Sequence, residues 1–444
     1  MQVCIMQLTI QIHDEGQWRD AFHLTFREPA EGFLGPCSCA YDRDYIVRHI
    51  TDVLAQDESA VSYNFPVGFD DNTFKVAPAF LHDISPAGAA RSSLMRRIGG
   101  EKPDGLATDL FLLGRCTPAP IGNMRIKESA DLIDQSARLG FPREEVIALS
   151  TEFIDYAYDQ GAAIGGASGA GGAAPKILMT QDKNGLLYPD ASLPDAEAAE
   201  HWFIKFPRGQ ALNEDIAILR AEYLYYKAIH QIGLNTVPQG GLALHEGRKP
   251  SLWMKRFDRE ISPEGVKRSA VESIYSLAGV SEPGFQMSHL QVIDMLVSIW
   301  RYAGQEDEIP DLVSEYLRRD LLNQVLGNTD NHGRNTSIIR EKGRFKLAPI
   351  YDLAPMSADR EGIIRTTRWP KQIELANSVN WEAACMSLGT YAHPARLYER
   401  LREDAKLFLH LPELLQPDLP DVIWNHPSIP LANLKDRMQA WGVL

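Results

Sequence analysis

The chain has 444 residues, of which 44% are hydrophobic and 23% are charged, and its formal net charge is -14. That length predicts two or three folded domains, and the composition is ordinary for a folded, water-soluble protein. An acidic chain without a long basic block argues against direct binding of nucleic acid, which depends on neutralising phosphates.

The cysteines and the apolar runs indicate the cellular compartment. The five cysteines are odd in number and no pair has CxxC spacing, which predicts neither a disulfide framework nor a zinc site. Free thiols suit a reducing cytosol. No run approaches the roughly 18 apolar residues of a membrane span, and the first residues lack the basic and apolar regions of a signal peptide. We therefore expect a cytoplasmic protein without a membrane partner.

Alternating apolar residues mark the start of the chain as β-rich. Met6, Leu8, Ile10 and Ile12 are separated by polar residues, which predicts a half-buried strand. Further elements are expected in chain order: a strand over 21–26, helical structure over 74–100, strands over 110–113 and 123–126, and helices over 128–139 and 143–158. These patterns predict an N-terminal subdomain over residues 1–145, β-rich at first and then helical.

A glycine-rich stretch follows at residues 161–174, with six Gly and six Ala. By composition alone it is a flexible linker. Strands are predicted directly after it, from Pro175 to Met179 and over 202–206, and a glycine-rich turn between strands is one way to cover the phosphates of a nucleotide. We predict a kinase N-lobe over 146–260, in which ATP is contacted by Ser168, Gly169, Gly171, Lys176 and Lys205.

A long helix is predicted next, with Asn213 as its N-cap and Gly233 beyond its end. Glu222 lies beside the apolar face of this helix, where a half-buried carboxylate needs a cationic partner. Lys205 and Glu222 resemble the lysine–glutamate pair of protein kinases. The alternative is a surface ion pair of little energetic value.

Strands are expected again over 241–244 and 251–257. The second would end at a kinase hinge, where Met254, Lys255 and Phe257 contact adenine and Asp258 reaches the ribose. The alternative is a strand end with exposed charge. The neighbouring basic residues Arg256, Arg259, Lys267 and Arg268 are interpreted as a solvated face or as small anion contacts.

The strongest motif is GNTDNHGRN at residues 327–335, followed by FKLAPIYD at 345–352. Phosphoryl transfer needs a base for the attacking hydroxyl, oxygen ligands for Mg²⁺ and a cation on the phosphates. Asp330 can be the base. Asn335 follows five residues later, the Asp-to-Asn spacing of the kinase catalytic loop, and Asp352 ends an apolar run. Oxygen ligands from Asn335 and Asp352 suit Mg²⁺.

The same motif is rich in turn-forming residues and could be a polar surface turn. An apolar helix, predicted around Val313 to Val325, precedes it and a buried strand pair follows it, which favours the functional interpretation. His332 has no second His or Cys at ligand spacing, so it is expected to support the loop or to contact phosphate rather than to bind metal.

Taken in order, GASGAGGAAPK, FIKFP, MKRFDR, GNTDNHGRN and LAPIYDLAPM resemble the HipA family of bacterial serine/threonine kinases, the toxins of HipBA-type toxin–antitoxin systems. The resemblance covers roughly residues 75–370, and residues 80–97 also resemble stand-alone HipA-like proteins. It implies an α+β fold that is bilobed and kinase-like, with an N-terminal β-rich subdomain and a mostly helical C-terminal lobe over 261–444.

The resemblance also implies a function. Asp330 and Lys205 would be catalytic, Asn335 and Asp352 would hold Mg²⁺, and His332 and Asn335 would contact ATP. Ser168 would be the autophosphorylated serine, although this chain carries one residue more than the usual family loop between Ser168 and Lys176. Family substrates are aminoacyl-tRNA synthetases, whose phosphorylation slows growth, and the family's partner is a small helix-turn-helix antitoxin.

Two other functions stay open at this point. One is a small-molecule kinase of the aminoglycoside-phosphotransferase type, which shares the same ATP machinery. The other is a non-catalytic kinase-like scaffold for a DNA-binding antitoxin. The presence of Lys205, Asp330, Asn335 and Asp352 favours an enzyme over the scaffold.

Overall fold

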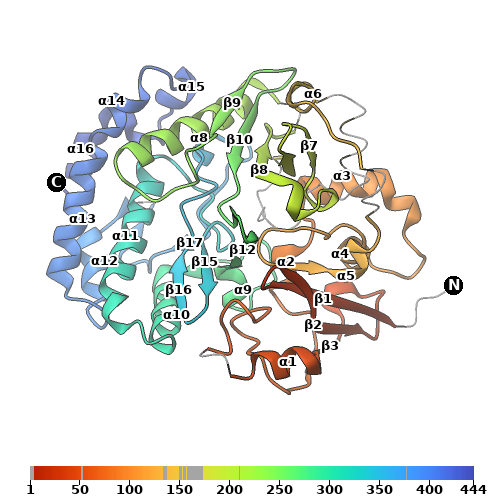
Figure 1. Ribbon diagram of the computed structural model, residues 1–444. Helices are drawn as coiled ribbons and strands as arrows, with labels where there is room; N and C mark the ends of the chain where they lie inside the picture. The colour runs from red at the N-terminus through yellow and green to blue at the C-terminus, as the bar shows by residue number, and fades with distance from the viewer. Residues whose placement is uncertain are drawn as a thin grey trace. The chain divides into compact units, whose positions relative to one another are not determined.

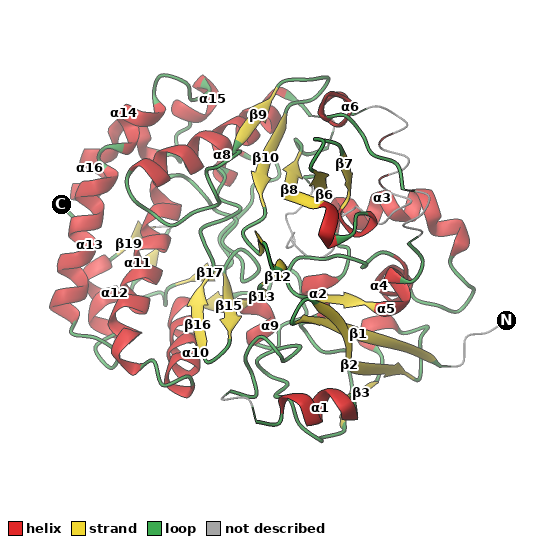
Figure 2. Cartoon of the chain, viewed as in Figure 1, coloured by secondary structure: helices red, strands yellow, loops and turns green. Residues whose placement is uncertain are grey.

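The computed structural model describes residues 5–51, 54–133, 138–149, 153, 157, 174–209, 211–376 and 378–444. Most of the predicted glycine-rich loop, with Ser168, Gly169 and Gly171, lies outside these residues. The chain forms two compact units. Unit 1 comprises Met1–Phe206, His245–Pro283 and Ser337–Lys346, and unit 2 comprises Pro207–Leu244, Gly284–Thr336 and Leu347–Leu444. Unit 1 holds most of the strands and unit 2 most of the long helices (Figures 1 and 2).

The first sheet of unit 1 has the strand order β4-β3-β2-β1-β5. Its strands are β1 Met6–Asp14, β2 Gln17–Phe26, β3 Cys37–Tyr41, β4 Asn72–Phe74 and β5 Met124–Ile126. A tight turn at Glu15 and Gly16, both with positive φ, joins β1 to β2. Leu8, Ile10 and Ile12 are buried, so the predicted alternating strand is confirmed, as are the strands expected at 21–26 and 123–126.

Short helices accompany this sheet: α1 Arg43–His49, α2 Leu81–Ile84, α3 Gly88–Ile98, α4 Thr108–Arg115, α5 Lys127–Ala130 and α6 Arg143–Ala148. The helical structure expected over 74–100 is largely confirmed by α2 and α3. The strand predicted at 110–113 is wrong, because these residues belong to α4. All four are buried, and a run that is apolar on every side fits a buried helix as well as a strand.

The predicted helix over 128–139 is too long, and the helix predicted over 143–158 is interrupted at Leu149. α5 ends at Ala130, and tertiary contacts fix this short turn: the Glu128 carboxylate accepts from the Thr9 N–H, and the Ser129 hydroxyl accepts from the Thr117 N–H. α6 ends at Leu149, whose φ of 51° lies in the left-handed region. Beyond it Phe153 and Ala157 are helical, and the other residues of 150–158 lie outside the described residues.

The second sheet of unit 1 has the order β7-β6-β8-β10-β9. Its strands are β6 Lys176–Asp182, β7 Leu187–Pro189, β8 Ala198–Lys205, β9 Ala243–His245 and β10 Ser251–Lys255. The strands expected after the glycine-rich stretch are therefore confirmed, with shifted ends. One face packs into a core that contains Ile177, Met179, Trp202, Ile204 and Trp253.

Two small sheets complete unit 1. They are the hairpin of β11 Arg259–Ser262 and β12 Gly265–Arg268, and the sheet β13-β15-β16, formed by Ala270–Ser273, Ser337–Glu341 and Arg344–Leu347; α9 covers Ile274–Leu277. Arg340 on β15 is fully buried. Its guanidinium donates to the carbonyls of Asp57 (2.6 Å) and Ala60 (2.9 Å) and lies 3.1 Å from the Glu272 carboxylate. One arginine thus ties this late strand to the N-terminal part of unit 1.

Unit 2 is built from helices: α8 Asn213–Gln231, α10 His289–Tyr302, α11 Ile309–Val325, α12 Trp381–Ser387, α13 Pro394–Phe408, α14 Leu411–Leu415, α15 Asp421–Trp424 and α16 Leu434–Ala440. Two-residue strand pairs join β14 Met287–Ser288 to β17 Thr367–Arg368, and β18 Glu374–Leu375 to β19 Ser378–Val379. The helices predicted around 213–231 and 313–325 are confirmed. The N-cap of α8 is Leu212 rather than Asn213, because the Asp215 carboxylate accepts from the Leu212 N–H.

The three segments 1–145, 146–260 and 261–444 remain a prediction; the two compact units have other boundaries. Among the described residues, no helix combines the length and apolar character needed to cross a bilayer. Cys37, Cys39, Cys116 and Cys385 are free and buried, and burial raises the pKa of each thiol to about 12.

Candidate active site

The motif at residues 327–335 forms a loop in unit 2 directly after α11. Gly327 opens the loop with a φ of +66°. A Cβ at this position would lie 2.5 Å from the Ile429 side chain and 2.7 Å from the Ser357 hydroxyl. Only glycine combines this backbone conformation with this close packing, so the sharp exit from the helix depends on it.

Side-chain amides hold the backbone of this loop. The Asn328 side chain donates to Asn323 Oδ1 (2.9 Å) and accepts from the Asp330 N–H (3.1 Å). Asn335 Nδ2 donates to the Asp330 carbonyl (2.7 Å). The backbone of Asp330 is therefore fixed from both sides, and its side chain keeps 15% of its surface exposed. A group held in this way is preorganised for chemistry.

A second asparagine ties the loop to β17. Asn331 Nδ2 donates to the Thr367 carbonyl (2.7 Å), and Asn331 Oδ1 accepts from the Thr366 N–H (3.1 Å) and the Thr367 N–H (3.3 Å). The side-chain amide thus pairs with a backbone segment as a neighbouring strand would.

Asn335 has the features expected of a metal ligand. Its Nδ2 is used by Asp330, which sets the orientation of the amide, and its Oδ1 is buried without a hydrogen-bond partner. An unpaired buried acceptor costs free energy unless a donor or cation satisfies it. Within the described residues, no group of three His, Cys, Asp or Glu side chains is arranged to hold a metal. The expected Mg²⁺ ligands, one amide and one carboxylate, are a different combination, and the Asn335 oxygen fits it.

Asp352 lies in a strained turn that packs against α8. Its φ is +51°, an uncommon value for a residue other than glycine. The Tyr226 hydroxyl donates to Glu222 (2.9 Å) and accepts from the Leu353 N–H (3.3 Å). Burial, followed by the nearby charges of Glu222 and Asp352, raises the pKa of Tyr226. Glu222 is only 1% exposed, so a surface ion pair is ruled out for it.

Lys176 and Lys205 lie directly opposite each other in the register of β6 and β8. They are 8% and 7% exposed. Opposed residues of neighbouring strands share a face with Cβ atoms about 5 Å apart, and like charges there are destabilising. Two buried lysines thus lie side by side where β6 begins and β8 ends.

The side chains predicted to form the hinge point to different faces of the second sheet of unit 1. Leu252 pairs with Lys205 and Met254 with Phe203, so Met254 lies on the face of the lysine pair. Lys255 points to the other face, where its ammonium lies 2.6 Å from the Glu200 carboxylate. Only the backbone of Lys255 is thus left for a hinge contact. Phe257 is half-buried beyond the strand end.

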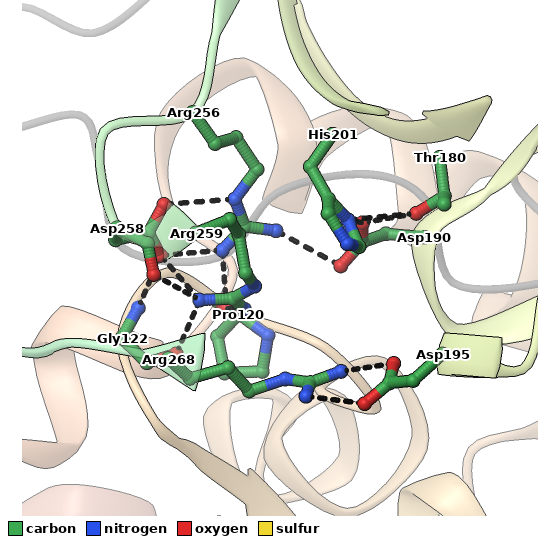
Figure 3. A network of polar contacts seen from close by, with 10 residues as sticks. All are labelled: Pro120, Gly122, Thr180, Asp190, Asp195, His201, Arg256, Asp258, Arg259 and Arg268. Carbon is green, nitrogen blue, oxygen red and sulfur yellow. Dashed lines mark hydrogen bonds and ion pairs between the residues drawn. The ribbon is translucent and has the colours of Figure 1, made fainter. Parts of the chain in front are cut away.

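Asp258 belongs to a buried ion network (Figure 3). Its carboxylate accepts from Arg256 (2.9 and 2.6 Å), from Arg259 (2.7 Å) and from the Gly122 N–H (2.8 Å). Asp258 is 2% exposed, which disagrees with the exposed strand end considered above. Burial by itself would raise the pKa of Asp258, but the adjacent Arg256 and Arg259 outweigh that effect and hold the pKa well below its usual range. Both of its oxygens are engaged by these donors, which gives the carboxylate a structural role in the network; its contact with a ribose stays a prediction.

The arginines of the network extend across unit 1. Arg256 also lies 2.9 Å from Asp190, which accepts from His201 Nδ1 (2.8 Å), and Arg268 binds Asp195 through two hydrogen bonds of 2.6 and 2.7 Å (Figure 3). Burial, and then repulsion by Arg256, lowers the pKa of Arg259 to about 9. Apart from the exposed Lys267, the predicted solvated basic face is therefore wrong: these arginines are buried and neutralised.

A family model described as "HipA-like C-terminal domain" matches residues 168–407, more than half of the chain. The chain belongs to the HipA-like family. The match includes β6, β8, α8, the loop at residues 327–335 and the Asp352 turn.

Two known proteins are similar to this HipA-like chain. A protein named "Putative kinase Y4dM" from Sinorhizobium fredii is 26% identical over 288 residues, 63% of this chain and 62% of the relative. The chain therefore spans about three fifths of that curated relative's length. HipA of Shewanella oneidensis MR-1, solved in a toxin–antitoxin complex with HipB and operator DNA, superposes with a TM-score of 0.64 at 16% identity, over 98% of this chain and 96% of HipA. The expected fold is confirmed: α+β and kinase-like, β-rich toward the N-terminus and helical toward the C-terminus.

Sequence reasoning missed two features of this HipA-like chain. The clustering of Arg256, Asp258 and Arg259 in MKRFDR indicated charge but not its burial, since Gly122 and Asp190 come from distant segments. The contact of Tyr226 with Glu222 and the Leu353 N–H was also missed, although the spacing of Glu222 and Tyr226 along one helix could have indicated half of it.

Proposed function

We propose that this HipA-like chain is an ATP- and Mg²⁺-dependent protein kinase that phosphorylates serine or threonine hydroxyls. The observation that carries the proposal is the catalytic loop, in which Asn335 fixes the Asp330 backbone while its own Oδ1 stays unpaired and buried. A base with a fixed backbone beside an unsatisfied oxygen ligand is what phosphoryl transfer needs.

Each residue has a defined part in this proposal. The Asp330 carboxylate takes the proton of the substrate hydroxyl as the hydroxyl oxygen bonds to the γ-phosphorus and the bond to the β-phosphate oxygen breaks. Lys176 and Lys205 neutralise the phosphates, and Asn335 and Asp352 hold Mg²⁺. When bound, the ion would shield charge on the phosphate oxygens. Met254 and the strand end beyond it would contact adenine.

The proposal extends to substrate and partner through the family. HipA of Shewanella oneidensis was solved with HipB, and on that likeness we propose a small antitoxin as partner. A translation component such as an aminoacyl-tRNA synthetase is the proposed substrate, with growth inhibition as the consequence. Autophosphorylation at Ser168 is also part of the proposal. A phosphate of charge near -2 would disrupt a loop that cradles phosphates.

The test is incubation of the purified chain with γ-labelled ATP and Mg²⁺, with and without cell lysate. The matched control is Asp330→Asn, which keeps the shape of the side chain and removes the base. Label on a lysate protein, absent with the variant, would support a protein kinase. If no protein is labelled but ATP is consumed with a small alcohol, the chain is a small-molecule kinase. Nucleotide binding without any turnover would leave the non-catalytic scaffold as the remaining interpretation.

A further inference from the structure

His332 is buried inside the catalytic loop, two residues after Asp330. It is 2% exposed. Its Nδ1 lies 3.2 Å from the Arg334 backbone N–H and accepts from it. Because a backbone N–H can only donate, this Nδ1 carries no proton, and the proton of the neutral ring is on Nε2.

The protonated Nε2 lies 3.3 Å from Asp330 Oδ1. The other contacts of Asp330 are made by its backbone, with Asn328 and Asn335. Within the part of the chain that the structure describes, His332 is thus the side chain found against the Asp330 carboxylate. The backbone contacts fix where Asp330 is, and His332 fixes how its carboxylate is turned.

We propose that His332 is a positioning residue, whose Nε2–H binds Oδ1 of Asp330 and leaves Oδ2 to take the proton of the substrate hydroxyl. This inference rests on the proposed kinase function. Both ring nitrogens are directed at atoms of the loop, and the expected contact of His332 with the nucleotide stays a prediction. A third group that orients a catalytic base is a recurring arrangement in enzyme sites.

Two substitutions separate this role from a merely structural one. In His332→Gln the amide nitrogen reaches the place of Nε2, so a donor toward Asp330 is kept. In His332→Asn the shorter amide reaches only the place of Nδ1, so the contact with the Arg334 N–H is kept and the donor toward Asp330 is lost. The two variants thus each retain one of the two contacts.

The measurement is the rate of label transfer from ATP to the lysate protein that the wild-type chain marks, with kcat and KM for ATP determined separately. We expect His332→Asn to lower kcat about 100-fold, the loss that a small misplacement of a reacting group can cause. His332→Gln should lower it less than about 10-fold, and KM for ATP should change little in either. Thermal unfolding of both variants shows that they are folded.

Three results would overturn the inference while the proposed function stands. They are equal kcat values for the two variants, a slower Gln than Asn variant, and a rise in KM for ATP with unchanged kcat, which would make His332 a phosphate contact. As a second measurement, His332→Asn is combined with Asp330→Asn. If His332 acts through Asp330, the residual rate falls no further; a further 100-fold loss would show an independent role. A wild-type chain that labels nothing would overturn the proposed function, and this inference with it.

Discussion

Two aspartates follow apolar elements in this chain, one in each compact unit, and their surroundings differ. Asp258 in unit 1 accepts from two arginines and a backbone N–H, and its neighbours Arg256 and Arg259 are themselves neutralised. Asp330 in unit 2 has its backbone N–H and carbonyl bonded to Asn328 and Asn335, while its side chain stays partly exposed and the nearby Asn335 Oδ1 has no partner. From the sequence, Asp258 was expected to reach the ribose and Asp330 to act as the base. A site with every acceptor used stabilises a fold, whereas one with acceptors left over can bind and react.

The sharpest way to test this contrast is Asp330→Asn. We expect label transfer to fall about 10³-fold, because a general base contributes roughly 10²- to 10⁴-fold. The melting temperature should hardly change, since the contacts of Asp330 that hold the loop are made by its backbone. Single-turnover kinetics and thermal unfolding measure the two quantities. A near-normal rate would remove Asp330 from the mechanism.

The opposite outcome is expected for Asp258→Asn. The substitution removes the carboxylate that binds Arg259 and leaves Arg256 with Asp190 alone. Breaking a buried ion pair in this way costs about 3–5 kcal/mol of stability. Denaturant unfolding measures the loss, and hydrogen exchange should place it in unit 1. A variant of normal stability with weakened ATP binding would instead restore the ribose contact predicted from sequence.

Asp352→Asn tests the metal part of the site. Asparagine tolerates the left-handed backbone that this position requires, so the substitution removes charge without adding strain. Loss of a ligand carboxylate should weaken ATP binding in Mg²⁺ by roughly 10- to 100-fold, a range known for ligand-shell mutations. Titration of a fluorescent ATP analogue with Mg²⁺, and with EDTA as control, measures it. If the substitution changes the affinity for the ATP analogue equally in Mg²⁺ and in EDTA, Asp352 is not a metal ligand.

The smallest effect expected is on the dependence of stability on pH. Burial lowers the pKa of His13 in unit 1 and of His289 in unit 2 from 6.5 to about 4. The unfolded chain therefore takes up protons first as the pH falls, so this stabilisation is present above pH 6.5 and is lost toward pH 4. The Asp258 contribution, whose pKa is lowered, should persist through this range and be lost only at more acid pH.

Thermal unfolding between pH 7 and pH 5 would measure that effect. The melting temperature should fall as the pH is lowered. His13→Gln and His289→Gln should each make this dependence on pH shallower. An unchanged slope in both variants would show that these imidazoles are not responsible.

Local pattern was sufficient for much of the fold and for part of the site. Strand β1 followed from alternation and α11 from its apolar face, and the candidate site at residues 327–335 came from one contiguous motif. The strand expected at Leu110–Leu113 failed because burial on all sides removes any period. The Asp258 network could not be predicted, because only the fold brings its members together. Gly122 lies 136 positions from Asp258, and Asp190 lies 66 positions from its partner Arg256.

The buried guanidinium of Arg340 has a consequence for biosynthesis. It donates to carbonyls near residue 60 and lies beside Glu272. These contacts can form only after β15 has left the ribosome, so a nascent chain that has just exposed its N-terminal sheet still lacks them. The loop at residues 327–335 is synthesised immediately before the strand that carries Arg340. Truncated products that stop before β15 would therefore lack the contacts of Arg340 and would be readily degraded by cellular proteases.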